Sequence, residues 1–125
     1  MRYSLLLYAQ EPQDAQVSDE DLEHFQVAFD MFGRSLDSAG VLVAAEVPQP
    51  VAATTSITRR RGEVEVDHAP ASDSRETLSG IFIIEVPDLD AAVGWAQKCP
   101  GSLYGVVEVR PSGASFYDGH WHSSG

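Results

Sequence analysis

The spacing of apolar residues changes along the chain and predicts its first two elements. Residues 1–8 form a short run rich in Leu and Tyr, with the length of a buried strand. From residue 22 the apolar positions recur every three or four residues, which places them on one stripe of a helix. The stripe consists of Leu22, Phe25, Phe29, Phe32 and Leu36. We therefore expect a strand followed by an amphipathic helix.

The ends of this helix carry recognisable signals. Ser18 is a suitable N-cap, and the acids at residues 19–21 lie where the helix dipole favours negative charge. Gly40 stands where a helix commonly ends with a residue in the left-handed conformation. The sequence therefore predicts a helix between Ser18 and Gly40.

Three further strands are expected in the remainder of the chain. Residues 41–47 and 80–86 are apolar runs of strand length, and the second, GIFIIEV, is the most β-prone segment. Residues 105–110 alternate Val with charge, which is typical of a strand with one polar face. We expect residues 80–86 to be central and buried.

A hairpin and a second helix complete the pattern. Residues 55–60 and 63–67 alternate Thr, Ile and Val with charge around Gly62, which predicts a two-stranded hairpin. Asp88 is positioned to cap a helix that continues to Pro100. The adjacent basic residues Arg59 to Arg61 are more typical of an exposed turn than of a phosphate site.

The resulting order is strand, helix, strand, hairpin, strand, helix, strand. It predicts an α+β fold, a ferredoxin-like βαβ-βαβ unit with an inserted β-hairpin and both helices on one face of an antiparallel sheet. Two helices cannot cover both faces of the sheet. The predicted strands at residues 5–7 and 81–84 carry aliphatic residues on both of their sides. We therefore expect a homodimer in which two sheets face one another.

The length, net charge and cysteine content of the chain limit its expected partners and location. With 125 residues the chain has the length of one domain, and no run approaches the roughly 18 apolar residues of a membrane span. A formal net charge of −11 repels phosphate backbones, so we expect no nucleic-acid partner. We see no targeting segment, which predicts a cytoplasmic location. The lone cysteine, Cys99, precludes an intrachain disulfide and is expected in the core.

Ionisable residues gather in one predicted loop, residues 67–80. It contains His68, Asp73, Arg75 and Glu76 between two strand-like runs. Loops held by a rigid scaffold commonly carry binding and catalytic groups, although a solvated connection has the same composition. Nearby acids would raise the basicity of His68, and Arg75 would hold an anionic group of a substrate.

Several strings, taken together in their order and spacing, resemble the YCII-related proteins of the DGPF subgroup. The resemblance covers residues 1–111 and leaves residues 112–125 as a tail. It rests on MRYSLLLY, AGVLVAAEVPQP, VDHAPASDSRETLSG, IFIIEVPDLDAAVGWAQKCPG and VVEVRP. It implies a dimeric α/β barrel with a cavity. At the subgroup's Asp-Gly-Pro-Phe segment this chain has His68-Ala69-Pro70-Ala71, a departure that leaves two alternatives open, loss of the family activity or a changed or larger ligand.

The resemblance also implies candidate site residues. Some relatives place the His of a proposed His and Asp dyad near the first helix, where His24 lies, although a surface histidine there is equally ordinary. At least one member of the family acts on a chlorinated hydroxyquinol. Glu46 and Arg110 lie in strands that the family pattern retains and are candidates for substrate binding. Glu108 and Arg110 share a strand face, where a structural ion pair is the simpler role.

Two functions remain open at this stage. The first is a cofactor-independent enzyme of small-molecule metabolism, such as a lyase, isomerase or dehydrohalogenase-like catalyst, with His68 or His24, Asp73 and Glu76 moving protons and Arg75 or Arg110 binding an anion. The second is a non-catalytic dimeric module that binds a metabolite or a protein. No nucleotide, cofactor or metal motif appears.

The tail contains both ionisable and aromatic residues. Asp118, His120 and His122 form only a weak metal signal, because their spacing alone is not specific. The aromatic residues Phe116 and Trp121, with their neighbour Tyr117, are unusual for a free tail. We expect them to cover a cavity of this chain or of its partner.

Overall fold

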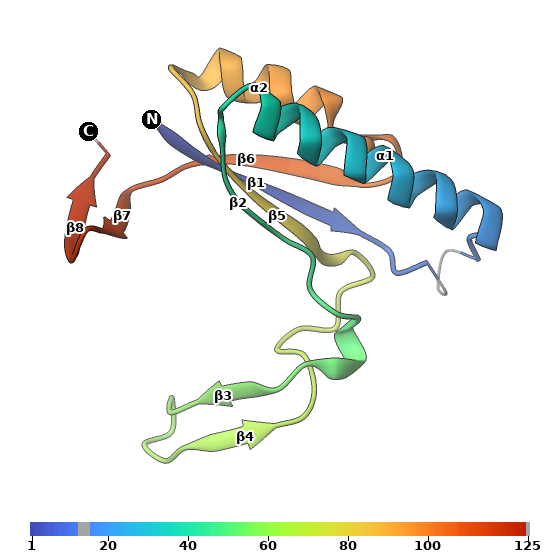
Figure 1. Ribbon diagram of the computed structural model, residues 1–125. Helices are drawn as coiled ribbons and strands as arrows, with labels where there is room; N and C mark the ends of the chain where they lie inside the picture. The colour runs from blue at the N-terminus through green and yellow to red at the C-terminus, as the bar shows by residue number, and fades with distance from the viewer. Residues whose placement is uncertain (13–15, 125) are drawn as a thin grey trace.

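The computed structural model describes residues 1–12 and 16–124 and has an α+β fold. A four-stranded sheet has the order β2-β5-β1-β6, with every neighbouring pair antiparallel. Both helices lie on the same face of this sheet (Figure 1). The main elements are β1 (Arg2–Ala9), α1 (Asp19–Ser38), β2 (Leu42–Glu46), β5 (Thr77–Glu85), α2 (Leu89–Lys98) and β6 (Val106–Pro111). The α+β class predicted from the sequence is confirmed.

The predicted helix ends are confirmed. The Ser18 hydroxyl accepts a hydrogen bond of 3.1 Å from the backbone N–H of Asp21 at the start of α1. Gly40 follows the helix with a φ of 73°, the left-handed conformation that favours glycine. Asp88 caps α2 by accepting from the N–H of Ala91 at 2.9 Å. Local sequence therefore sets where both helices begin.

The sheet separates its side chains into two faces. In β1 the residues at odd positions are buried, and those at even positions are half-buried. Leu5 lies opposite Phe82 of β5 and Val109 of β6, so all three point toward the helices. We call this the covered face, and the opposite one, which carries no helix, the uncovered face.

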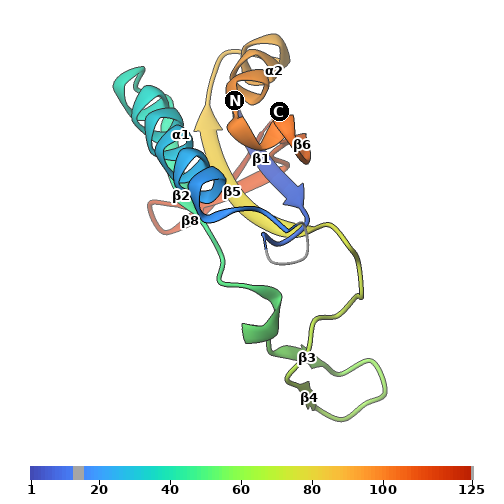
Figure 2. The same cartoon turned by 90° about the vertical axis from the view of Figure 1, so that its right-hand side faces the viewer.

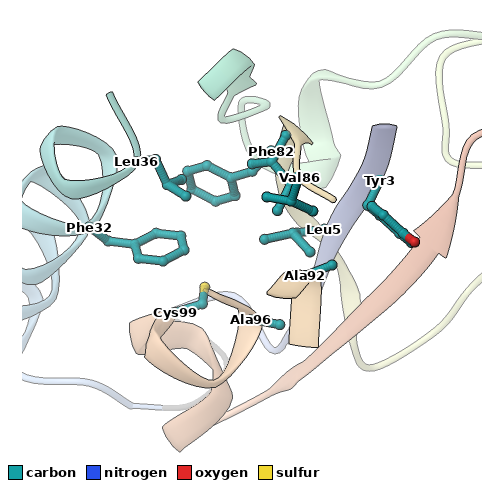
Figure 3. Packing of buried hydrophobic residues seen from close by; sticks show 10 residues of the cluster. Tyr3, Leu5, Phe32, Leu36, Phe82, Val86, Ala92, Ala96 and Cys99 are labelled. Carbon is teal, nitrogen blue, oxygen red and sulfur yellow. The ribbon is translucent and has the colours of Figure 1, made fainter. Parts of the chain in front are cut away.

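The core fills the space between the covered face and the helices (Figure 3). Phe32 of α1 packs edge-on against Phe82, with ring centroids 5.1 Å apart. Leu36 and Ile84 are fully buried beside them, and Cys99 lies in the same cluster, as the sequence predicts. Burial raises the pKa of the Cys99 thiol above its usual 9.0, so this residue is a protonated, apolar part of the core.

The inserted segment forms a hairpin of two short strands, β3 (Ser56–Thr58) and β4 (Glu65–Asp67), preceded by the 3-10 turn η1 (Val51–Ala53). It extends away from the sheet on the side opposite the helices (Figures 1 and 2). Its strands are shorter than the sequence predicts because the turn opens from Arg59, and Gly62 adopts a φ of 93° within it. The hairpin is confirmed, with fewer paired residues.

The C-terminal residues form another hairpin, β7 (Ala114–Tyr117) and β8 (His120–Ser123), which follows the turn η2 (Pro100–Leu103) and strand β6. Tyr117 stacks on His122 with centroids 3.6 Å apart, and the Arg2 guanidinium lies 4.8 Å from the Tyr117 ring. Within the described residues, none of the helices is long and apolar enough to cross a membrane.

Candidate functional site: a cavity at the end of the sheet

A cavity of about 730 Å³ lies where β1 ends and β5 begins, beneath the first half of α1. We call it the main cavity. Its volume is within the range of roughly 300–1,000 Å³ that is usual for small-molecule sites. Most of its wall is apolar and includes Leu7, Leu22, Phe25, Phe29, Val47 and Phe82. The lining therefore suits the apolar part of a small molecule.

The length of α1 produces this cavity. Phe32 and Leu36, in the second half of the helix, pack into the core against β5. Leu22 and Phe25, from the same apolar stripe, instead line the main cavity near the helix start. The stripe therefore serves two purposes along its length, although its sequence pattern is uniform.

Tyr104, which follows η2, forms part of the opposite wall. Its ring lies 4.6 Å from that of Phe25, in a tilted arrangement. Burial raises the pKa of the Tyr104 phenol, and interaction with Cys99 raises it further. The hydroxyl is therefore protonated near neutral pH and able to donate a hydrogen bond to a ligand in the cavity.

A second, more polar cavity of about 490 Å³ adjoins the first, and we call it the polar annex. The two share four lining residues, namely Gln10, Glu11, Val51 and Thr77. The annex adds Asp73, Ser74 and Arg75, which come from the predicted site loop. An apolar volume thus opens beside a charged one.

Arg75 is positioned by a neutral partner. With the Gln10 amide oxygen facing the guanidinium, that oxygen accepts from Nε at 3.1 Å and from Nη2 at 2.8 Å. Within the described part of the chain, no carboxylate lies within 4.0 Å of the Arg75 guanidinium. Among the described residues, its positive charge is therefore oriented by the Gln10 amide and not by a direct ion pair.

Glu11 connects the first strand with η1. Its carboxylate accepts a 2.7 Å hydrogen bond from the backbone N–H of Val51. Both residues border the main cavity and the annex. This contact fixes the place where the two volumes meet.

His68 lies apart from the acids with which the sequence predicts it to act. Its Nδ1 is 3.3 Å from the Thr55 hydroxyl at the base of the β3–β4 hairpin, and its side chain is exposed. Asp73 borders the annex and Glu76 the main cavity, and neither hydrogen-bonds to His68. The structure thus does not join His68 to these two acids by hydrogen bonds, because residue 68 continues the hairpin, whereas residues 73–76 lead into β5, and a catalytic role for them stays a prediction.

The other candidate residues occupy separate places. His24 is exposed on α1 and lines neither cavity, although its neighbour Phe25 does. Glu46 pairs with Ile81, and Arg110 pairs with Ser4, which places both charges on the uncovered face. Among the residues that the structure describes, no ion pair joins Glu108 to Arg110, so that predicted structural pair is wrong.

The tail does not cover the chain's own cavity. No residue of β7 or β8 lines the main cavity or the annex. His120 and His122 have ring centroids 4.1 Å apart, and within residues 1–12 and 16–124 no cluster of three His, Cys, Asp or Glu side chains is arranged to hold a metal. Covering of a partner's cavity stays a prediction.

Two of the cavity residues have no signal in the sequence. Gln10 and Tyr104 lie in connections and belong to no recognisable motif. Phe25 and Leu22 were visible only as parts of a core stripe. The one sequence feature that indicates their place at a cavity is the length of the helical apolar stripe, which exceeds the length of the strands that the helix covers.

Comparison with known proteins gives two results. A sequence model of the YCII-related domain matches residues 1–112. The chain is also similar to the "Uncharacterized protein R00369" of Rhizobium meliloti (strain 1021), with 31% identity over 115 residues, covering 89% of this chain and 91% of the relative. Both matches span nearly the whole chain, and the family match includes the strands and helix that surround the main cavity.

Proposed function

This chain belongs to the YCII-related domain family, and from that premise we propose that it is a dimeric domain that binds a small metabolite in the main cavity. The observation that carries the proposal is the continuity of an apolar cavity with an annex containing Arg75. The apolar body of the ligand occupies the main cavity. Its polar group reaches the annex.

The charges around the two cavities limit the ligand further. Of the residues that the structure describes, Glu11, Asp73 and Glu76 line them together with a single arginine, Arg75. A polyanion such as a phosphate ester would be repelled by three carboxylates, whereas one carboxylate or phenolate can be matched by Arg75. The proposed ligand is therefore apolar with a neutral polar group or a single negative charge.

The quaternary structure is part of the same proposal. The strand order β2-β5-β1-β6, with both helices on one face, supports a ferredoxin-like unit of a dimeric α/β barrel. On the uncovered face, Leu6, Ile81 and Ile83 are only half-buried. A second sheet packed there would exclude them from water. Membership of the DGPF subgroup and a cytoplasmic location stay predictions.

Binding of a fluorescent probe tests the cavity. Anilinonaphthalene sulfonate combines an apolar ring system with one negative charge, as proposed for the ligand. Thr77→Trp places a large ring where the main cavity and annex meet, and should weaken probe binding about tenfold or more through steric exclusion. Val43→Trp, on β2 outside both cavities, is the control and should bind as the wild type. Equal binding by both variants would refute the proposal.

Acid–base catalysis by His68 is the second candidate. It is favoured by one observation, that His68 lies beside exposed apolar residues of the hairpin, where packing of another chain would remove it from water. Wild-type protein and His68→Ala, with His24→Ala alongside, are incubated with a metabolite extract and compared by mass spectrometry. A compound consumed only when His68 is present would support catalysis, and identical profiles would exclude it for those metabolites.

A further inference from the structure

We propose that the β3–β4 hairpin is an arm that packs against a second copy of this chain. The contact uses one side of the hairpin, made of Ile57, Val64 and Val66, which we call the arm face. This inference goes beyond the cavity, and it specifies which part of the chain grips the partner in the proposed dimer.

The pairing of the strands places these apolar side chains together. Ile57 lies directly opposite Val66, so their side chains share one side of the hairpin. Val64 lies two residues before Val66 and just outside β4, and strand alternation continued to it would put its side chain on the same side. Their exposed fractions are 70% for Ile57, 51% for Val64 and 56% for Val66. A contiguous apolar surface of this kind on a projecting element is typical of an interaction site.

The hairpin is also too small to be stable by itself. Each strand has three residues, and β3 and β4 pack chiefly against one another rather than against the body. A two-stranded hairpin is at best marginally stable in water and needs a further packing surface. A hairpin of this size is therefore stabilised if its apolar side is covered in the assembled protein.

Charge favours a second copy as the cover. Residues 56–67 contain three arginines and three acids, so the arm is neutral, while the rest of the chain carries the whole net charge of −11. Two such acidic chains repel one another, and contact through the neutral arm keeps that repulsion small. An anionic membrane surface would repel the body of the protein in the same way.

The uncovered face of the sheet lies on the same side of the molecule as the arm. The arm extends on that side of the sheet, away from the helices (Figures 1 and 2). The same face presents Leu6, Ile81 and Ile83, which also need a cover. In a two-fold dimer each copy supplies both an arm and a sheet face, so a single partner buries both apolar surfaces.

In the proposed dimer, His68 lies at the interface between the two subunits and no longer in solvent. Thr55 and His68 face each other across the base of the hairpin, as their 3.3 Å contact shows, and both are on the side of Ile57 and Val66. Packing of the arm face therefore places His68 at the subunit interface. The histidine that is solvent-exposed in one chain then lies against the other.

Sedimentation of point variants tests the arm. Ile57→Asp and Val66→Asp put a charge on the arm face, and each should raise the dimer dissociation constant about 100-fold or more, as expected for a central apolar contact. Leu103→Asp makes the same chemical change at a side chain that is 86% exposed on η2, and should stay within about threefold of wild type. Circular dichroism checks that each variant is folded.

Hydrogen exchange gives an independent measurement. Amides of residues 56–67 should exchange more slowly in concentrated wild-type protein than in dilute protein, and this difference should vanish in Ile57→Asp. A wild type that stays monomeric up to about 100 µM, well above the dissociation constants of most specific interfaces, would overturn the arm and the dimer together. Dimers of unchanged affinity in both arm variants would overturn the arm alone. The probe-binding result for Thr77→Trp depends on neither.

Discussion

The two faces of the four-stranded sheet carry similar aliphatic residues and have different surroundings. Ile84 points toward the helices and is fully buried, while its neighbour Ile83 points away and is half-buried. Tyr3, Leu5 and Leu7 of β1 are buried on the covered face, and Leu6 between them is not. The fold therefore uses one face for its own core, and the other is the face to which we assign the proposed partner.

The candidate chemistry divides along the same line. The main cavity lies at the end of the covered face, where α1 extends past the packed core, and the polar annex adjoins it. Glu46 and Arg110 are on the uncovered face, and His68 is on the arm that extends from it. The proposed ligand-binding site and the proposed surface for self-association thus lie in different parts of the molecule.

The largest expected effect separates the two faces directly. Ile84→Ala should lower the free energy of unfolding by about 2–5 kcal/mol, because it opens a cavity in the core. Ile83→Ala should cost about 1 kcal/mol or less in dilute, monomeric protein, since its side chain is already partly exposed. Urea unfolding measures both. Equal losses would mean that the two faces do not differ as described.

A second expected loss of stability concerns Gly105, whose backbone lies against the backbone of β1. A Cβ at Gly105 would collide with the Tyr8 carbonyl oxygen, so Gly105→Ala should destabilise the protein by about 1–3 kcal/mol. At Gly94 in α2 a Cβ meets no atom within 4 Å, and Gly94→Ala should stabilise by about 0.5–1 kcal/mol. Thermal melts should show shifts of opposite sign, and a neutral Gly105→Ala would contradict the close packing of β1.

A smaller effect distinguishes the annex from the uncovered face. Arg75→Ala should weaken anilinonaphthalene sulfonate about three- to tenfold, because a charge-assisted contact is lost in a partly exposed site. Binding of the neutral probe phenylnaphthylamine should stay nearly unchanged. Arg110→Ala is the matched control and should affect neither probe in fluorescence titrations. Equal weakening of both probes by Arg75→Ala would show that the annex does not select charge.

The smallest effect is a pH dependence that originates in the core. Burial raises the pKa of Cys99 above 9.0, its usual value, so the folded state holds the thiol proton more tightly than the unfolded state. The resulting stability is fully present below pH 9 and is lost as pH rises toward the folded pKa. Urea unfolding at pH 8 and pH 10 should show a smaller decline for Cys99→Ala than for wild type. The same decline in both would contradict the assignment.

Local signals in the sequence predicted the elements well. Ser18, Gly40 and Asp88 determine where the helices begin and end through hydrogen bonds and conformations that depend on adjacent residues. The strands β1 to β6 and their order of appearance followed from alternation and apolar runs, whereas the hairpin of β7 and β8 was not predicted, because the sequence analysis treated residues 112–125 as a tail. The hairpin strands were predicted too long because alternation continues through the turn, whereas pairing does not.

The site was harder to predict because it depends on distances between elements. Leu22 and Leu36 belong to one apolar stripe of α1, yet Leu22 lines the main cavity and Leu36 lies in the core. The difference arises because the sheet beneath the helix ends before Leu22, and the sequence of the helix does not show where the sheet ends. His68 and Asp73 are close in sequence, but the hairpin base separates them. Of the predicted site residues, the structure places Arg75, Asp73 and Glu76 at a cavity, and all three come from the segment that leads into β5.

One titration tests the central claim, that small molecules bind in the main cavity and not at the histidines. Anilinonaphthalene sulfonate is titrated into wild type, Thr77→Trp, His24→Ala and His68→Ala under identical conditions. The cavity predicts an affinity loss of about tenfold or more for Thr77→Trp and changes below about twofold for both histidine variants. Loss of binding in a histidine variant, with Thr77→Trp unaffected, would contradict it.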